Sequence, residues 1–257
     1  MRVSVCSTSF NCAEAIEGHC RSVFSALNGL EYEYIIVDNR SRDGTFERLR
    51  DAALENPRLT PFQERCSRGK GRQRAVELAS FETILSIDVD TIYRPELRIF
   101  LDSYADQFLP KGLALQAIYA GLYPRELWFR AGGMRDLNFA EDFDLWMRIW
   151  RLGRMRWTPV FMGENKKPIE ERDANDVLSH RYSRHHRLSR VLRREIDFWR
   201  TREYARLDLG SILKTDVVDI GLGELQSVWF DEGGARSARH SLSRVAHQVH
   251  AILTDRS

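Results

Sequence analysis

Two aspartates separated by one apolar residue form the spacing with the clearest chemical meaning in this chain of 257 residues. Asp88 and Asp90 directly follow residues 83–87, an apolar run with the length of a buried strand. Two carboxylates in that place can lie beside one divalent cation, which in turn can neutralise a diphosphate. A D-x-D triplet on its own also occurs by chance as a solvated cap of a strand. The triplet therefore predicts a metal site only if neighbouring segments bring further polar groups to it.

Polar residues at two other places could take part in the same chemistry. Asp38 ends the apolar run 34–37, where its carboxylate could accept hydrogen bonds from the imide of a pyrimidine or from a ribose. Asp43, in contrast, is expected to close an Asx-type turn with Gly44. The basic glycine turn at residues 68–72 could bring cations and backbone N–H groups to a phosphate, although such a turn is more often a solvated loop.

An acidic pair at Glu141 and Asp142 comes just before an amphipathic, aromatic segment with helical spacing. An acid at the N-terminus of a helix usually acts as a cap or as a partner of the helix dipole. One that faces a cleft could instead remove the proton from an attacking hydroxyl. Asp144 competes for either role, and the three acids point in different directions on a helix.

Alternating strand and helix patterns position these residues. The predicted strands are residues 3–7, 34–37 and 83–87, and the predicted helices are residues 13–27, 45–54 and 72–80. Strands separated by helices of this length predict right-handed β-α-β units and a parallel sheet. Ligands of such sheets bind beyond the carboxyl ends of the strands, and the polar segments 8–11, 38–39 and 88–90 all fall there.

Composition describes an ordinary globular protein, with 43% hydrophobic and 30% charged residues and a formal net charge of +2. These values exclude a disordered or fibrous chain, and the charge by itself indicates no class of partner. The four cysteines form no C-x-x-C pair, so a reduced, cytoplasmic protein is expected. We find no pattern of a signal peptide and no apolar stretch long enough to span a bilayer.

The last third of the chain, residues 166–257, predicts a mainly helical extension. Residues 184–206, which begin at Arg184 and end at Arg206, place apolar residues on one helical face and Arg and His on much of the rest. Two interpretations stay open: a helix that packs on the core, or a peripheral contact with an anionic membrane surface. Residues 237–253 predict a second amphipathic helix that could pack or support a homodimer.

The order of these motifs resembles that of family 2 glycosyltransferases. Residues 3–11, and then residues 35–45 in place of the common "VDDGSTDGT" segment, look like the opening of that family. The resemblance continues through Gly69-Lys70-Gly71, the D-x-D, and a Gly-Gly pair before Glu141-Asp142, so that it covers residues 3–155. It implies a GT-A fold, with a Rossmann-like, mostly parallel central sheet flanked by helices. The catalytic domain would span residues 1–165, with a nucleotide-binding half (1–90) and an acceptor half (91–165).

The resemblance also implies a reaction and a set of site residues. The chain would move a sugar from a UDP- or GDP-sugar to a hydroxyl of a saccharide or lipid-linked acceptor, with inversion and with Mn²⁺ or Mg²⁺ on the diphosphate. The implied residues are Thr8 and Asn11 beside the nucleotide, Asp38 at the base, Arg68 or Lys70 at the base or phosphates, Asp88 at the ribose or a metal-bound water, Asp90 as a metal ligand, and Asp142, paired with Glu141, as general base.

Two departures from the family pattern and three rival interpretations remain. Asn39 replaces the second acid that often follows Asp38, and no Q-x-x-R-W element follows the acidic pair, which argues against a processive polysaccharide synthase. A nucleotidyltransferase would need a glycine-rich loop after the first strand, where residues 7–11 contain no glycine. A nucleic-acid-binding protein would leave the aspartates unexplained, so no nucleic acid partner is expected. A family member that has lost activity and only binds a partner is the third alternative.

Overall fold

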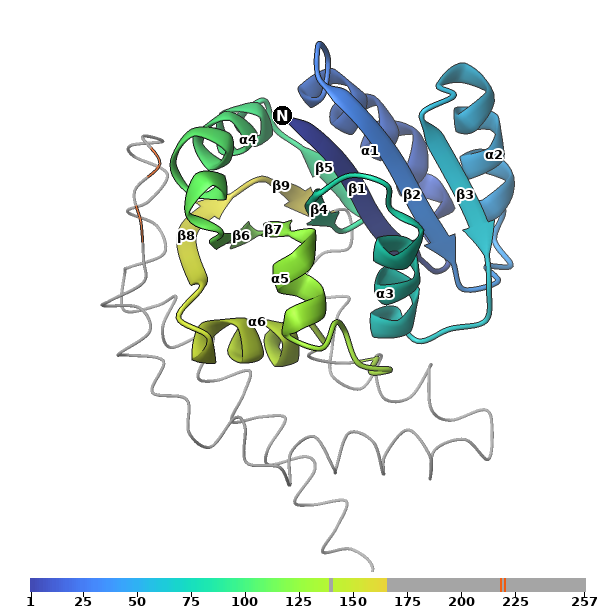
Figure 1. Ribbon diagram of the computed structural model, residues 1–257. Helices are drawn as coiled ribbons and strands as arrows, with labels where there is room; N and C mark the ends of the chain where they lie inside the picture. Colours follow the sequence, from blue (N-terminus) through green and yellow to red (C-terminus); the bar gives the residue numbers. More distant parts are fainter. Residues whose placement is uncertain (139–140, 166–217, 219, 221–257) are drawn as a thin grey trace, which may run out of the picture.

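A seven-stranded sheet forms the centre of the protein, with strand order β3-β2-β1-β4-β7-β6-β8 (Figure 1). The computed structural model describes residues 1–138, 141–165, 218 and 220. The strands of this sheet are β1 (Arg2–Ser9), β2 (Glu31–Asp38), β3 (Leu59–Gln63), β4 (Thr83–Ile87), β6 (Ala114–Ile118), β7 (Ala120–Pro124) and β8 (Met155–Phe161). Two short strands, β5 (Thr91–Tyr93) and β9 (Gly163–Asn165), pair with each other as a separate antiparallel ribbon.

The sheet is mostly parallel, as the sequence predicts. β1 pairs in parallel with both β2 and β4, and β2 pairs in parallel with β3. β7 runs antiparallel to its neighbours β4 and β6, and β6 is parallel to β8. The chain therefore builds one side of the sheet outward from β1 to β3 before it returns to the other side of β1 with β4.

Helices cover both faces of the sheet. The helices are α1 (Ala13–Ala26), α2 (Thr45–Glu55), α3 (Arg68–Leu78), α4 (Glu96–Gln107), α5 (Arg125–Arg130) and α6 (Glu141–Arg151), with one 3₁₀ turn, η1 (Leu109–Lys111). One buried cluster joins α1, α2 and α4 to one face, and a second joins α3, α5 and α6 to the other. The strands alternate accordingly: Val3 and Val5 belong to the first cluster, and Cys6 belongs to the second.

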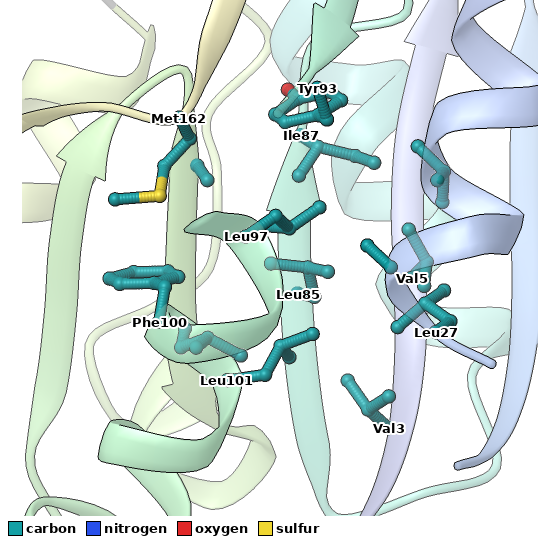
Figure 2. Close-up of a cluster of buried hydrophobic side chains, with 14 of the residues drawn as sticks. Val3, Val5, Leu27, Leu85, Ile87, Tyr93, Leu97, Phe100, Leu101 and Met162 are labelled. Atoms are coloured by element: carbon teal, nitrogen blue, oxygen red, sulfur yellow. The ribbon is translucent and has the colours of Figure 1, made fainter. Parts of the chain in front are cut away.

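The first cluster packs apolar side chains of β1 and β4 together with those of α1 and α4 (Figure 2). Val5 of β1 and Leu85 of β4 are neighbours across the sheet, and both have no exposed surface. Leu97 and Phe100 of α4 pack in the same cluster and are also fully buried. Each side chain of this size contributes about 1.5–3 kcal/mol through burial, so the relative position of these two strands is strongly determined.

Two expectations about local structure are wrong. Residues 59–63, which are not among the predicted strands, form β3, an edge strand in which Pro61 is tolerated because its missing N–H costs no interior ladder bond. The helix expected to begin at residue 72 begins at Arg68, because Ser67 caps it by accepting a hydrogen bond from the Lys70 N–H at 3.1 Å. Gly69 and Gly71, which indicated a turn in the sequence, lie in its first turn.

The segments expected to contact a membrane or a second copy, 184–206 and 237–253, lie outside the described residues. Val218 does contact the core, since its N–H donates to the Trp157 carbonyl oxygen at 2.8 Å. Ile220 is 5% exposed and belongs to the first cluster. Among the residues that the structure describes, no helix is long and apolar enough to cross a bilayer.

Buried hydrogen bonds connect α1 to β1, to the middle of β2 and to the end of β4. The His19 Nδ1–H donates to the Thr91 carbonyl oxygen at 2.8 Å, and the Tyr34 hydroxyl donates to His19 Nε2 at 2.6 Å. Ser7 Oγ lies 3.0 Å from the Tyr34 hydroxyl and donates to the Ile87 carbonyl oxygen at 2.9 Å. These hydrogen bonds therefore tie α1 to the segment that carries the D-x-D. Burial lowers the pKa of His19 to about 4.

We expect acid to destabilise the fold through His19. The folded-state pKa lies below the ordinary value of 6.5, so the unfolded chain binds the proton more tightly and stability is lost as pH falls from 6.5 toward 4. His19→Gln removes this proton, so urea unfolding of the two proteins should diverge below pH 6.5 by up to about 1.4 kcal/mol per pH unit. The difference in the free energy of unfolding between the two proteins at pH 7 is the baseline. If this difference stayed constant down to pH 4, the lowered pKa of His19 would be contradicted.

Candidate active site

The carboxyl ends of β1, β2 and β4 lie next to one another, at the point where the chain switches from one side of β1 to the other. Ser9 lies opposite Asp38 in the parallel register, and Asp38 lies opposite Gln63 at the end of β3. In open α/β sheets, such a switch point is where ligands bind. The structure therefore brings Thr8, Asp38 and the D-x-D to one edge, as the sequence predicts.

The D-x-D forms the turn between β4 and β5. Val89 is 3% exposed and packs in the first cluster, while Asp88 and Asp90 keep part of their surface in solvent. The Asp88 N–H donates to the Tyr93 hydroxyl at 3.0 Å, and that hydroxyl donates to the Tyr119 carbonyl oxygen at 2.6 Å. Burial of Val89 thus leaves two carboxylates at the surface of a rigid turn.

A buried arginine joins the D-x-D to the acidic pair. Arg72 of α3 donates through Nη2 to Asp88 Oδ1 and through Nη1 to Glu141 Oε1, the latter at 3.0 Å. The Arg72 and Glu141 side chains are 9% and 1% exposed. Burial by itself lowers the pKa of Arg72, but Asp88 and Glu141 raise it overall, so the guanidinium stays charged. One cation therefore holds together two acids that lie far apart in the chain.

The three acids at the start of α6 have different surroundings. Glu141 faces Arg72, and Asp144 is buried with its Oδ2 bonded to Arg148 Nη2 at 2.5 Å and its Oδ1 3.1 Å from Arg135 Nη1. Asp142 is partly exposed, and its Oδ1 accepts from the Phe143 N–H at 2.9 Å. Burial, followed by the charge of Glu141, raises the pKa of Asp142 to about 6. Of the three, Asp142 alone combines access to solvent with a raised pKa, as a general base requires.

Asp38 is fully buried, and four donors surround its carboxylate. Oδ1 accepts from Ser9 Oγ at 3.0 Å and from Ser41 Oγ at 2.5 Å. Oδ2 accepts from the Ser41 N–H at 2.8 Å and from Gln63 Nε2 at 3.1 Å. A carboxylate has about four acceptor positions, so a base that hydrogen-bonds to Asp38 must replace one of these donors. Gln63 is the exposed one.

The loop after β2 is held by residues of the first strand–helix connection. Asn11 adopts a left-handed φ of 47°, and its Oδ1 accepts from the Arg42 N–H at 3.0 Å. Asp43 closes the predicted turn by accepting from the Thr45 N–H at 3.1 Å, and it also accepts from the Ala13 N–H at 3.0 Å. This loop is thus organised by the protein itself.

The start of α3 offers side chains, not backbone N–H groups, to a ligand. The N–H of Arg68 donates to Asn138 Oδ1 at 3.2 Å, that of Gly69 to the Leu137 carbonyl oxygen at 2.9 Å, and that of Lys70 to Ser67 Oγ. The backbone N–H groups of residues 68–70, which the sequence left open as a contact for phosphate, are therefore bonded within the protein. The Arg68 and Lys70 side chains are 41% and 50% exposed, 3.6 Å from Glu141 Oε1 and 3.4 Å from Glu64 Oε1.

Both glycines of this segment are required by close packing. A Cβ at Gly71 would lie 2.3 Å from Thr8 Oγ1, and a Cβ at Gly69 would lie 2.1 Å from the Arg135 carbonyl oxygen. Thr8 Oγ1 itself donates to the Val37 carbonyl oxygen at 2.9 Å. The Gly-x-Gly pattern therefore brings α3 against the end of β1 and against the loop before α6, which places Arg72 between Asp88 and Glu141.

The carboxylates at this edge could bind a divalent cation jointly with the phosphates of a substrate. In the part of the chain that the structure describes, no group of three or more His, Cys, Asp or Glu could hold a metal alone. Mg²⁺ is commonly held by one or two carboxylates plus the phosphates of a substrate, and Asp88 and Asp90 supply such a pair. When all groups are ionised, the site contains four carboxylates (Asp88, Asp90, Glu141 and Asp142) and two guanidinium groups (Arg68 and Arg72). The net charge of these six groups is therefore −2, which a divalent cation would balance.

Three residues near this edge were not singled out from the sequence. Arg72 was seen only as the end of a basic turn, and nothing in the sequence shows that it is buried between acids. Gln63 is the last residue of β3, a strand that the sequence did not predict. Asn165, whose Nδ2 donates to Asp90 Oδ1 at 3.0 Å, lies 75 residues from its partner. Gln63 and Asn165 each end a strand, and that position was the available signal for them, whereas Arg72 lies in helix α3 and carried no such signal.

Comparison with known proteins relates the chain to enzymes that transfer sugars. The family described as Glycosyl transferase family 2 matches residues 4–160. No curated protein gave a match.

Three solved structures show the fold. The mannosyltransferase PcManGT from Pyrobaculum calidifontis, in complex with GDP-Man and Mn²⁺, is 21% identical, with a TM-score of 0.54 over 65% of this chain and 56% of that chain. TarS 1–349 from S. aureus with UDP-GlcNAc is 19% identical, with a TM-score of 0.52 over 63% and 57%. Glucosyl-3-phosphoglycerate synthase from Mycobacterium tuberculosis, with Mn²⁺, UDP and its product, is 15% identical, with a TM-score of 0.55 over 69% and 79%.

The chain thus spans little more than half the length of the first two proteins. At these identities the likeness concerns the fold, and the expected GT-A fold is confirmed.

We expect removal of the Arg72 cation to destabilise the protein strongly. Arg72→Met removes the hydrogen-bonded cation of Asp88 and of the buried Glu141, which then has only the more distant Arg68 Nε, 3.6 Å away, among the ion pairs of the described residues. Breaking a buried ion pair in this way typically costs about 3–5 kcal/mol. Adding Glu141→Gln should recover part of that loss, because the unpaired buried charge disappears. Urea unfolding at pH 7 measures both.

The matched control is Arg21→Met, which removes a short ion pair to Glu17 whose side chains are 75% and 73% exposed. An exposed pair contributes less than about 1 kcal/mol. Equal losses in Arg72→Met and Arg21→Met would show that the Arg72 cluster does not stabilise the fold.

Proposed function

The chain belongs to glycosyl transferase family 2, and on this basis we propose that it transfers a sugar from a nucleotide-diphosphate sugar to an acceptor hydroxyl, with inversion and with a divalent metal. The donors bound by the similar structures, GDP-Man and UDP-GlcNAc, support this donor class. The observation that carries the proposal is the Arg72 bridge between Asp88 and Glu141. It joins carboxylates suited to a donor diphosphate to the acidic pair that contains a candidate base.

The nucleotide would bind across the ends of β1, β2 and β3. We propose that Thr8 and Asn11 line it, that Arg68 or Lys70 contacts the base or the phosphates, and that Asp38 acts at the base. Because Asp38 is fully buried, its contact with a base requires Gln63 to give up its hydrogen bond. Gln63 then offers an amide to the base edge, and whether the nucleotide is UDP or GDP depends on these two residues.

The D-x-D would serve the diphosphate. Asp90 would hold Mn²⁺ or Mg²⁺, with Asp88 beside the ribose or a metal-bound water, and the cation would neutralise the charge that develops on the leaving nucleoside diphosphate. The Mn²⁺ or Mg²⁺ ions present in three similar structures support this choice of metal. The two excess negative charges of the site support it independently.

Asp142 would act on the acceptor. The acceptor hydroxyl oxygen attacks the anomeric carbon as the bond from that carbon to the diphosphate oxygen breaks, and the hydroxyl proton goes to the Asp142 carboxylate. Attack from the side opposite the leaving group inverts the anomeric centre. Arg72 and Glu141 fix the start of α6, so they position Asp142 relative to the donor.

Other parts of the proposal rest on the sequence. We further propose a saccharide or lipid-linked acceptor, a peripheral membrane contact through residues 184–206, and a homodimer. The segments that would make the membrane and dimer contacts, 184–206 and 237–253, lie outside the described residues. The four cysteines are free thiols, which supports a cytoplasmic location.

Nucleotide binding tests the donor half of the proposal. UDP or GDP together with Mn²⁺ should raise the melting temperature of the wild-type protein, because a ligand that binds only the folded state stabilises it. Asp90→Asn should lose the Mn²⁺-dependent part of this shift and keep the melting temperature of the free protein. Duplex DNA is the negative control. A shift that is the same with and without Mn²⁺ would count against the metal assignment.

Turnover tests the acceptor half. Asp142→Asn should reduce kcat for hydrolysis or transfer by about 10²- to 10⁴-fold, which is the usual effect of losing a general base, with donor affinity unchanged. The base works in its ionised form, so kcat/KM of the wild type should fall as pH drops through about 6. Asp106→Asn on α4 is the matched control and should behave as wild type. Near-normal turnover in Asp142→Asn would exclude it as the base.

A further inference from the structure

Trp146 of α6 lies one helical turn after Asp142, the candidate base, and both side chains are partly exposed. Residues four positions apart are neighbours on one face of a helix, with about 5–6 Å between their Cβ atoms. Long side chains on a helix also lean toward its N-terminus. The indole ring of Trp146 therefore lies beside the turn that carries Asp142, on the face of α6 that an acceptor must approach.

A buried hydrogen-bond chain fixes this indole ring. Trp146 Nε1–H donates to the Tyr123 hydroxyl at 2.9 Å, and that hydroxyl donates to Gln116 Oε1 at 2.5 Å. Gln116 Nε2 in turn donates to the carbonyl oxygens of Ala117 and Ala120, at 2.5 and 2.9 Å. Tyr123 and Gln116 are 1% and 7% exposed. The chain thus ties the ring to β6 and β7, and each of its N–H and O–H groups has an acceptor.

The surroundings of the chain leave the ring little freedom. A Cβ at Gly121 would lie 2.2 Å from Gln116 Oε1 and 2.4 Å from the Tyr123 hydroxyl oxygen, so any other residue would displace both groups. The Phe143 ring lies against the indole, with centroids 4.8 Å apart and planes at 53°. The protein therefore sets the orientation of the indole before any ligand arrives, and preorganisation of this kind favours binding.

The charge of the candidate base reaches the same chain. Burial raises the pKa of Tyr123, and the negative charge of Asp142 raises it further. The Tyr123 hydroxyl is therefore neutral and close enough to Asp142 to feel its charge. The base and the chain that orients Trp146 thus belong to one neighbourhood of the structure.

An aromatic face of fixed orientation suits a ligand with one flat apolar face and a polar edge. A pyranose ring has this form, because C–H groups line its faces and hydroxyl groups project from its edge. The face of an aromatic ring is negatively polarised, so it attracts the C–H groups of such a ligand. A sugar ring stacked on Trp146 has edge hydroxyls within one helical turn of Asp142. A flexible chain or a small alcohol has no flat face and would gain less from this contact.

We propose that Trp146 binds the acceptor: its indole face stacks on a sugar ring, free or lipid-linked, and holds a ring hydroxyl beside Asp142. This inference rests on the proposed function and deepens it, because it names a sugar ring as the part of the acceptor that the protein recognises. Tyr123 and Gln116 are positioning residues, since they act on the acceptor through the orientation of the indole. Loss of stacking should raise KM for the acceptor much more than it lowers kcat.

Acceptor kinetics test the inference. Release of the nucleoside diphosphate is measured with the nucleotide sugar that the wild type hydrolyses, at rising concentrations of the methyl glycosides of glucose, galactose, mannose and N-acetylglucosamine. Trp146→Leu should raise KM for the preferred glycoside by about 10-fold, the order expected for one lost aromatic contact. Trp146→Phe keeps an aromatic face and should recover part of this loss. Tyr123→Phe, which removes the acceptor of the indole N–H, should raise KM by a smaller factor.

The matched control is Trp150→Leu. Trp150 is a partly exposed tryptophan one turn further along α6, and like Trp146 it packs against the second cluster. Its replacement should lower the melting temperature by a comparable amount and leave KM for the glycoside unchanged. Glycerol serves as a second acceptor that offers hydroxyl groups without a ring. With glycerol, Trp146→Leu and the wild type should have the same KM.

Several outcomes would overturn the inference and leave the proposed function intact. These are an unchanged KM in Trp146→Leu, an equal rise of KM in Trp150→Leu, or wild-type turnover that no methyl glycoside increases. A fall of kcat with glycoside and glycerol alike would overturn it too, because Trp146 would then act on the position of Asp142. So would a weaker Kd for the nucleotide sugar with an unchanged acceptor KM, which would assign the stacked ring to the donor.

Two further results complete the test. If Trp146→Leu does not fold, Trp146→Phe decides: an acceptor KM equal to that of the wild type in both Trp146→Phe and Tyr123→Phe overturns the inference. If the wild type neither binds nor hydrolyses any UDP- or GDP-sugar, the proposed function fails and the inference fails with it.

Discussion

The buried guanidinium of Arg72 is the interaction on which the organisation of the site depends. It bonds the partly exposed Asp88, just after β4, and the buried Glu141 at the start of α6, and its charge offsets the repulsion between these two acids. The start of α6 is therefore attached to the turn after β4, although the two segments are far apart in the chain. The glycines at 69 and 71 matter for the same reason, because they let α3 approach closely enough for Arg72 to reach both partners.

The parallel sheet explains why the other polar residues meet at the same edge. β1 lies between β2 and β4, so residues that end these strands become neighbours whatever their separation in sequence. Apolar side chains on both faces fix the strands, and the His19–Tyr34–Ser7 chain fixes the segment that continues into the D-x-D turn. The site is thus supported by a rigid core on one side and by hydrogen-bonded loops on the other.

The excess negative charge of the site destabilises the folded protein but suits the binding of a cation. Four carboxylates against two arginines leave an excess of negative charge, and the raised pKa of Asp142 reflects it together with burial. An ionised Asp142 is less favourable in the folded protein than in the unfolded chain, and a site that binds a divalent cation can tolerate this because the cation offsets the excess.

The sequence by itself determined the sheet and its edge: periodicity located β1, β2 and β4, and the polar residues after them predicted where Asp38, Asp88 and Asp90 would meet. It also determined the family, through the order of its motifs. It did not reveal β3, because Pro61 is compatible with a strand only at an edge, nor the true start of α3, because glycine lowers helix propensity wherever it occurs. Tertiary structure alone decided that Arg72 is buried between Asp88 and Glu141, that Gln63 holds Asp38, and that Asn165 holds Asp90. These are contacts between segments far apart in the chain, and local patterns of hydrophobicity and charge carry no information about which distant side chains become neighbours.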